Sequence, residues 1–179
     1  MHTTLATRLD QSVRVIPDFP KPGIQFKDIS PILLDPGLVH DCARALAAPY
    51  RSAGITLVAG IESRGFLLGP MLAQELDCGF VIVRKKGKLP GKTAERTYDL
   101  EYGTATIEVH TDHIKPGDRV LIHDDLLATG GTAAAAGHLC LQQGAELAGF
   151  CFLIELAALR GAEKLSTIHP SLVSLVRYD

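Results

Sequence analysis

The chain has 179 residues, of which 46% are hydrophobic, with 18 lysines and arginines against 20 aspartates and glutamates. This balance is typical of one soluble globular domain and excludes a disordered chain. A formal net charge of -2 provides no overall field that would attract nucleic acid or an anionic membrane, so neither is expected as a partner.

Residues 1–15 lack the apolar core and cleavage site of a signal peptide, and no later stretch is apolar enough for a membrane span. A cytoplasmic protein is therefore expected.

Leu5, Leu9 and Val13 recur at helical spacing and predict a first helix. Three prolines and a glycine then follow within residues 16–26, which predicts an ordered irregular segment or a lid.

A second helix is predicted to begin at Asp35-Pro36, because Asp caps free amides and Pro suits the first helical position. It should run to about Ser52, with Pro49 kinking or ending its last turn.

From residue 55 onward, apolar strands alternate with helices. Continuous apolar strands are typical of parallel sheets that are covered on both faces, so the predicted fold class is α/β, a mainly parallel sheet flanked by helices. Residues 1–179 are expected to form a single domain, with about 1–35 as a small N-terminal hood and about 36–179 as the α/β core. The predicted strands are 55–61, 79–83, 104–110, 119–124, 147–154 and 172–178, and the predicted helices are 64–76 and 131–143.

The segment VLIHDDLLATGGT, residues 120–132, combines an apolar strand, two acids, a glycine turn and a helix start. Ligands of open α/β sheets bind at the carboxyl ends of strands, where this turn should lie. Its glycines allow close backbone approach, and the helix presents unpaired N–H groups to an anion. A phosphate site is predicted there, and the absence of GxxxxGK[ST] and GxGxxG argues against triphosphate and dinucleotide sites. The predicted phosphate-binding residues are Ala128, Thr129, Gly130, Gly131 and Thr132.

Asp124 and Asp125 precede this turn. Two carboxylates repel a phosphate unless they face a sugar or a metal, so they are predicted to accept hydrogen bonds from ribose hydroxyls. They should also organise Mg²⁺ through water rather than bind it directly, since Mg²⁺ retains much of its hydration shell. The alternative is a solvated turn with an aspartate cap.

The segment from Arg84 to Arg96 holds six of the lysines and arginines, together with Gly87, Pro90 and Gly91. It follows an apolar strand and so starts at the same carboxyl edge as the phosphate turn. A mobile lid that closes over an anion is predicted, with a solvated loop or an RNA-binding patch as alternatives.

The segment VLIHDDLLATGGT resembles the phosphoribosyl-pyrophosphate signature of type I phosphoribosyltransferases. The motifs IPDFPKPGIQFKDISPIL, AGIESRGFLLGP, VRKKGKLPGKT and YDLEYGT occur in the order found in the members that act on adenine, and the resemblance covers about Val13 to Tyr178. It implies the type I phosphoribosyltransferase fold, a homodimer, and Mg²⁺-dependent conversion of adenine and phosphoribosyl pyrophosphate to AMP and pyrophosphate in purine salvage. His123 departs from the aliphatic residue usual there and is expected to be a core histidine with a hydrogen-bonding partner.

The resemblance also implies roles for single residues. Pyrophosphate would be bound by Arg84, Lys85, Lys88 and Arg64, and the loop around Glu62-Ser63 has an unusual cis peptide in this family. Glu101 would lie at the imidazole edge of the purine, with Tyr102 beside it, and a carboxylate there can take the proton displaced by ring attack. Glu101 and Arg64 are the expected catalytic residues.

For the base, the resemblance places the main chain of Gln25 and Lys27 at the adenine edge, with Phe26 on one ring face and Leu126 on the other. Backbone C=O and N–H groups suit adenine, which offers a donor at its amine and an acceptor at the neighbouring ring nitrogen. Ordinary core packing is the alternative for Phe26.

Two other functions share part of this pattern. A 6-oxopurine phosphoribosyltransferase has the same signature and differs in the base that it consumes. A non-catalytic sensor of phosphoribosyl pyrophosphate that regulates transcription would need a DNA-binding domain, for which residues 3–13 are too short.

Overall fold

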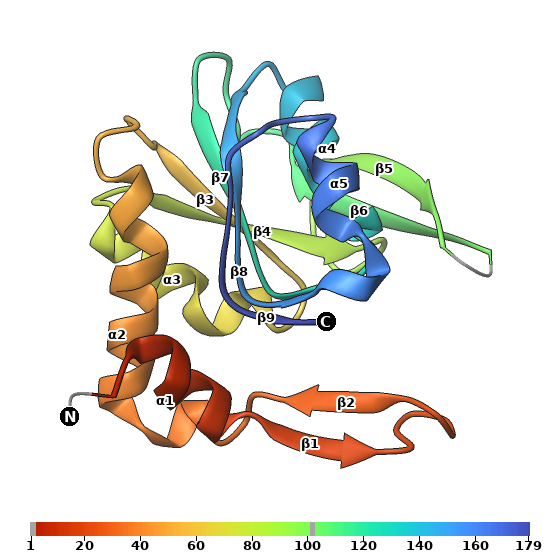
Figure 1. The fold of residues 1–179 in the computed structure, drawn as a ribbon. Helices are drawn as coiled ribbons and strands as arrows, with labels where there is room; N and C mark the ends of the chain where they lie inside the picture. The colour runs from red at the N-terminus through yellow and green to blue at the C-terminus, as the bar shows by residue number, and fades with distance from the viewer. Residues whose placement is uncertain (1–2, 101–102) are drawn as a thin grey trace.

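The structure is a computed structural model that describes residues 3–100 and 103–179, and its centre is a seven-stranded sheet (Figure 1). The strand order is β5-β6-β4-β3-β7-β8-β9. The five strands β4, β3, β7, β8 and β9 run parallel, and β6 and β5 continue the sheet antiparallel beyond β4. The predicted α/β class with a mainly parallel sheet is confirmed, and the antiparallel pairs lie at the β5 edge of the sheet. The strands of this sheet are β3 (Leu57–Ile61), β4 (Gly79–Lys85), β5 (Thr93–Asp99), β6 (Thr104–His110), β7 (Arg119–Leu127), β8 (Glu146–Leu156) and β9 (Leu172–Tyr178).

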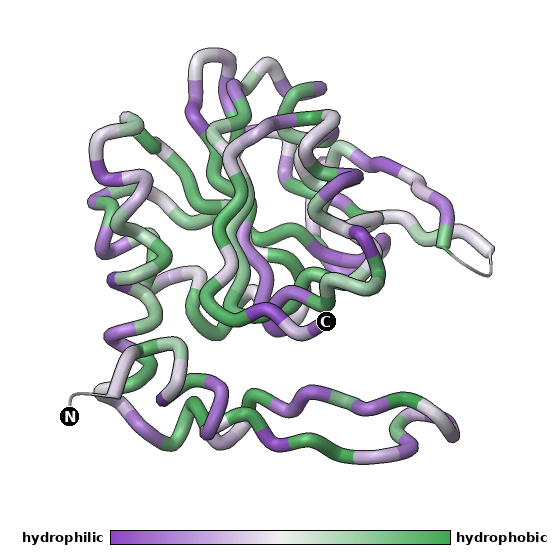
Figure 2. The backbone as a smooth tube through the Cα atoms, viewed as in Figure 1, coloured by the Kyte–Doolittle hydropathy of each residue, from purple (hydrophilic) through white to green (hydrophobic). Residues whose placement is uncertain are grey.

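Helices cover both faces of the sheet and create two apolar clusters. The helices α2 (Pro36–Ala47) and α3 (Gly65–Glu75) pack on one face, and α4 (Gly131–Gln142) packs on the other, next to the short α5 (Gly161–Ser166). Along β7, Val120 and Ile122 belong to the α4 cluster and Leu121 belongs to the opposite one. The hydrophobic colouring of the central strands in Figure 2 reflects this burial on both faces.

The start of α2 follows the prediction. Asp35 is the N-cap, and its Oδ1 accepts a hydrogen bond of 3.0 Å from the Leu38 N–H. The helix ends at Ala47, earlier than the predicted Ser52, and a 3-10 turn that contains Pro49 follows. Proline lacks the N–H that another α-helical turn would require.

The N-terminal region contains α1 (Leu5–Ser12) and a hairpin of β1 (Arg14–Pro17) and β2 (Gln25–Asp28). The prediction of an irregular segment was wrong for the residues of β2, because the prolines lie at the end of β1 and in the connecting turn. That turn is held by the Asp18 carboxylate, which accepts a 2.8 Å hydrogen bond from the Gly23 N–H. The hairpin adjoins the carboxyl edge of the sheet, since Lys27 contacts Tyr178 at the end of β9.

The basic segment after β4 also differs from its prediction. Glu108 of β6 is 2% exposed, and its Oε1 accepts hydrogen bonds of 2.8 Å from the N–H groups of Lys88 and Leu89. Lys86 forms a 2.7 Å ion pair with Glu95 of β5. The segment is therefore a turn and a strand tied to the sheet by these contacts, whereas its sequence predicted a mobile lid.

Candidate active site

The turn after β7 forms a small cavity at the carboxyl edge of the sheet. Its volume is about 90 Å³, and its lining includes Asp124, Leu126 and residues 128–132. Gly130 precedes α4 with φ at +75°, and a Cβ there would lie 2.9 Å from the Gly161 carbonyl oxygen. Only glycine satisfies both constraints. The first N–H groups of α4 have no partner within the helix and are available to an anion in this turn.

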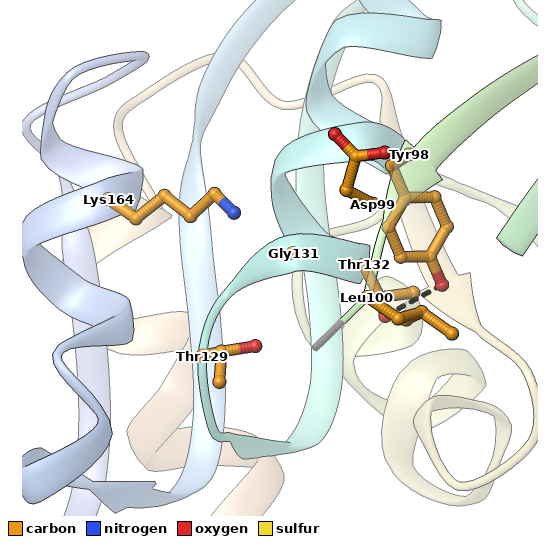
Figure 3. Close-up of a pocket in the computed structure, with 7 residues that line it drawn as sticks. All are labelled: Tyr98, Asp99, Leu100, Thr129, Gly131, Thr132 and Lys164. Carbon is orange, nitrogen blue, oxygen red and sulfur yellow. Dashed lines mark hydrogen bonds between the residues drawn. The ribbon is translucent and has the colours of Figure 1, made fainter. Parts of the chain in front are cut away.

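A larger cavity of about 610 Å³ adjoins the same turn, and Thr129, Gly131 and Thr132 line both cavities (Figure 3). Its lining combines the turn with the end of β5 and with α5. The Tyr98 hydroxyl and Thr132 Oγ1 are 2.9 Å apart in a hydrogen bond, which joins β5 to the start of α4. The lining residues are Tyr98, Asp99, Leu100, Thr129, Gly131, Thr132 and Lys164.

The two acids of β7 have different surroundings. Asp124 lines the cavity at the turn, whereas Asp125 is 2% exposed and lies beside Arg64, with Asp125 Oδ2 3.0 Å from Arg64 Nε. Despite this short distance, Oδ2 has no hydrogen-bond partner among the described residues. The contact is therefore an ion pair, and only Asp124 is directed to the cavity.

Burial governs the ionisation of this pair. Desolvation raises the pKa of Asp124 well above its ordinary value, and the charge of Asp125 raises it further. Desolvation also raises the pKa of Asp125, but the neighbouring Arg64 opposes that rise. A cation near Asp124 would oppose this rise and favour the ionised form of the carboxyl.

Arg84 and Lys85 lie around a third cavity of about 110 Å³, which Asp124 and Thr132 also line. The Glu62 carboxylate accepts hydrogen bonds from Arg84 Nε and Nη2, at 3.2 and 3.3 Å, and from the Lys85 N–H at 3.0 Å. Burial alone would raise the pKa of Glu62, but these donors outweigh it and the pKa is lowered. The Glu62-Ser63 peptide is cis.

A fourth cavity, of about 430 Å³, lies between the hairpin and α3. Phe26 lines it together with Arg64, whose guanidinium carbon is 5.4 Å from the Phe26 ring centre, and Phe19 meets Phe26 edge-on. Leu126 lines the cavity at the turn instead, so the structure does not bring Phe26 and Leu126 to one cavity.

The main chain of β2 has one edge that is not paired with β1. Pro17 stands opposite Gln25 and has no N–H, so this pair cannot exchange two hydrogen bonds. Pairs that exchange hydrogen bonds alternate along an antiparallel ladder, which assigns the exchange to Ile16 and Phe26. The N–H and C=O groups of Gln25 and Lys27 therefore point to the unpaired edge.

Several expected site residues lie together, while others lie apart or cannot be placed. Arg84 Nη1 donates a 2.9 Å hydrogen bond to the Lys88 carbonyl oxygen, so Arg84, Lys85 and Lys88 are neighbours. Arg64, which was also assigned to pyrophosphate, instead lines the cavity under Phe26. Glu101 and Tyr102 lie outside the described residues. Two further lining residues, Tyr98 and Lys164, were not predicted. Tyr98 belongs to the motif YDLEYGT, in which only Glu101 and Tyr102 were assigned roles, and Lys164 stands in a segment whose pattern indicates no ligand.

His123 is fully buried, and its Nδ1 lies 3.1 Å from the Cys151 carbonyl oxygen. A carbonyl can only accept, so Nδ1 carries the proton. Burial lowers the pKa of His123 to about 4, and the imidazole is neutral at physiological pH. The expected core histidine with a hydrogen-bonding partner is confirmed.

Comparison with known proteins identifies the family. Residues 30–170 match the family described as phosphoribosyl transferase domain. An adenine phosphoribosyltransferase of Methylobacterium radiotolerans is 50% identical over 171 residues, which are 96% of this chain and 94% of that protein. The chain therefore belongs to the phosphoribosyltransferase family, and within it to the adenine phosphoribosyltransferases.

Solved structures agree with this assignment. The adenine phosphoribosyltransferase from Rhodothermus marinus, solved as a crystal structure, has 52% sequence identity to this chain. The two structures match with a TM-score of 0.92 over 99% of this chain and 100% of that one. The enzyme from Giardia lamblia, complexed with 9-deazaadenine, is 42% identical with a TM-score of 0.92 and covers 99% of each chain.

Gly130→Ala is expected to weaken binding of phosphoribosyl pyrophosphate at least ~10-fold, because a Cβ strains the turn and displaces it from Gly161. Gly117→Ala is the matched control, since Gly117 has φ at +90° and open space around its Cβ position. Both variants should lose thermal stability, but only Gly130→Ala should lose affinity in calorimetric titration. Equal affinities for the two variants would place the phosphate elsewhere.

Asp124→Asn is expected to raise the melting temperature at pH 7. The pKa of Asp124 lies above its ordinary value of 3.8, so ionisation disfavours the folded state as pH rises above about 4. Below that pH the protonated acid and the amide should be equivalent. Asp28→Asn is the opposite control: hydrogen bonds from Ser30, and then Arg14, lower the pKa of Asp28 to about 2, so this change should destabilise the protein at pH 7. A lower melting temperature for Asp124→Asn at pH 7 would contradict the assigned cost of burial.

Proposed function

We propose that the chain transfers the phosphoribosyl group of phosphoribosyl pyrophosphate to adenine, giving AMP and pyrophosphate in purine salvage. The observation that carries this proposal is the ion pair between Arg64 and Asp125. Arg64 lines the cavity under Phe26, and Asp125 adjoins Asp124 at the phosphate turn. One contact thus connects a cavity suited to a flat aromatic base with a turn suited to a phosphate.

The substrate would extend along the carboxyl edge of the sheet. The 5′-phosphate would lie against residues 128–132, and Asp124 would accept hydrogen bonds from the ribose hydroxyls. The pyrophosphate would lie near Arg84, Lys85 and Lys88, which adjoin the cavity that Asp124 also lines. Asp124 lines both the cavity at the phosphate turn and the cavity near Arg84 and Lys85, so the ribose would lie between the 5′-phosphate and the pyrophosphate.

Mg²⁺ is the proposed cofactor. No three His, Cys, Asp or Glu side chains converge as a metal cage within residues 3–100 and 103–179. Asp124 lines two of the cavities, and a single carboxylate there fits an ion held mainly by substrate oxygens and water. When bound, Mg²⁺ would help neutralise the charge that leaves with pyrophosphate.

In the proposed reaction, a purine ring nitrogen forms a bond to the anomeric carbon while the bond from that carbon to the pyrophosphate oxygen breaks. The basic residues stabilise the departing charge. Glu101 would accept the proton released by the purine, and Tyr102 would lie beside it. These last two roles rest on the family resemblance, since both residues are outside the described part of the chain.

The base would be read by backbone groups. The unpaired edge of β2 offers the N–H and C=O groups of Gln25 and Lys27, and the Phe26 ring offers an apolar face to the purine. Adenine matches alternating donors and acceptors, whereas a 6-oxopurine would leave them unpaired.

We also propose a homodimer, a cytoplasmic location and a single domain with residues 1–35 as its hood, as the resemblance and the composition imply. Residues 3–100 and 103–179 include no helix with the length and apolar character needed to cross a membrane.

Adenine should be used at least ~100-fold better than hypoxanthine or guanine in kcat/KM, because the wrong base leaves buried hydrogen-bonding groups unpaired. A spectrophotometric assay with the three bases measures this directly. A comparable value for hypoxanthine would identify a 6-oxopurine enzyme instead. No turnover of any base would favour the non-catalytic sensor.

Glu101→Gln should lower kcat roughly 100-fold or more while substrate affinities change little, because the amide has the shape of the acid but cannot take a proton. Glu95→Gln is the control, since Glu95 is an exposed acid that pairs with Lys86. An unchanged kcat for Glu101→Gln would remove Glu101 from the catalytic residues.

A further inference from the structure

Lys164 of α5 extends into the 610 Å³ cavity, toward the side on which Thr129 and Gly131 lie (Figure 3). The family resemblance assigned no role to this lysine. The position of Lys164 is set by the packing of the α5 backbone against the turn after β7. Gly161 packs so closely against the turn that an added Cβ would collide with the Ala128 carbonyl oxygen. Lys164 is three residues later in the same helix and therefore projects from the side of Gly161.

The charges around this cavity are unbalanced without Lys164. Residues 128–132 contain no lysine or arginine, whereas Asp99 lines this cavity and Asp124 lines the smaller cavity at the same turn. Lys164 is the one basic residue in the described lining of this cavity. A phosphate dianion held only by amides and hydroxyls would face these acids without a compensating cation.

Lys164 also forms no ion pair with an acid in the described part of the chain, although its neighbours Arg160 and Glu163 pair with each other. No acid in the described part of the chain therefore neutralises the amine. Asp99 lines the same cavity, but its carboxylate forms no ion pair with the Lys164 amine. The lysine is free to meet an anion.

We propose that Lys164 is a substrate-binding residue that contacts the 5′-phosphate of phosphoribosyl pyrophosphate and of AMP. This inference rests on the proposed function. The turn binds one side of the phosphate through N–H groups and Thr129, and α5 supplies the positive charge from the other side. Because the contact is to the 5′-phosphate, which is unchanged in the reaction, it affects binding of substrate and product alike and leaves the chemical step unaltered.

The test compares the wild-type enzyme with Lys164→Met and Lys164→Arg. Lys164→Met is expected to raise the KM for phosphoribosyl pyrophosphate and the Kd for AMP about 10-fold, the scale of a partly exposed charge-assisted contact. The kcat and the Kd for adenine, which has no phosphate, should stay within about twofold. Lys164→Arg should restore most of the affinity, and the difference between wild type and Lys164→Met should shrink at high salt.

Two controls keep the result specific. Lys115→Met removes an exposed lysine elsewhere and should leave the KM for phosphoribosyl pyrophosphate unchanged. Asp99→Asn tests whether Lys164 instead serves to pair with Asp99, which lines the same cavity. Loss of this negative charge should not weaken phosphate binding, so the variant should not reproduce the 10-fold loss.

The outcomes separate this inference from the proposed function. Conversion of adenine by the wild-type enzyme tests the function before any variant is made. If the wild type is active and Lys164→Met binds AMP normally, the inference is overturned and the function stands. A loss of affinity shared by Lys115→Met or Asp99→Asn would likewise overturn the phosphate contact.

Discussion

The burial of two adjacent carboxyl groups at the end of β7 is the constraint on which the site depends. Desolvation raises the pKa of both Asp124 and Asp125, so the fold alone would favour their neutral forms. Arg64 offsets the cost at Asp125 through a 3.0 Å contact, whereas Asp124 forms no ion pair among the described residues and lines the cavity. The fold therefore carries a local instability that bound cations would relieve, which is a common cost of a functional site.

Arg64 also ties the sheet to the hairpin. Its guanidinium lies over the Phe26 ring, so one residue at the start of α3 contacts the base cavity and the acid of β7. The hairpin has a second attachment at the end of the chain, where Lys27 Nζ lies 3.9 Å from the Tyr178 ring centre. The Tyr178 hydroxyl in turn donates a 2.8 Å hydrogen bond to Asp10 of α1. Segments from both ends of the chain thus determine the geometry of the base cavity.

The sequence predicted those features that depend on local pattern. Apolar runs identified the parallel strands, and Asp35-Pro36 identified the start of α2, because both signals act over a few residues. The hairpin was missed because its strands have four residues each, and prolines dominate the segment between them. The anchoring of the basic segment depends on Glu108, which is about 20 residues later in the chain. Lys164 likewise reaches the site only because Gly161 packs on the turn after β7, a contact between distant residues.

The two phosphate ends of the proposed substrate have different electrostatic surroundings. At the pyrophosphate end, Glu62 already engages the Arg84 guanidinium through two hydrogen bonds and also holds the Lys85 main chain. Arg84 therefore presents a partly compensated charge, so in the proposed binding mode the attraction for pyrophosphate comes mainly from the Lys85 and Lys88 side chains. A charge partly shared with Glu62 would bind the leaving group less tightly, which favours release of pyrophosphate after the transfer. The 5′-phosphate keeps its charge and its bond to the sugar throughout, so its end of the site can retain a free cation without hindering the reaction.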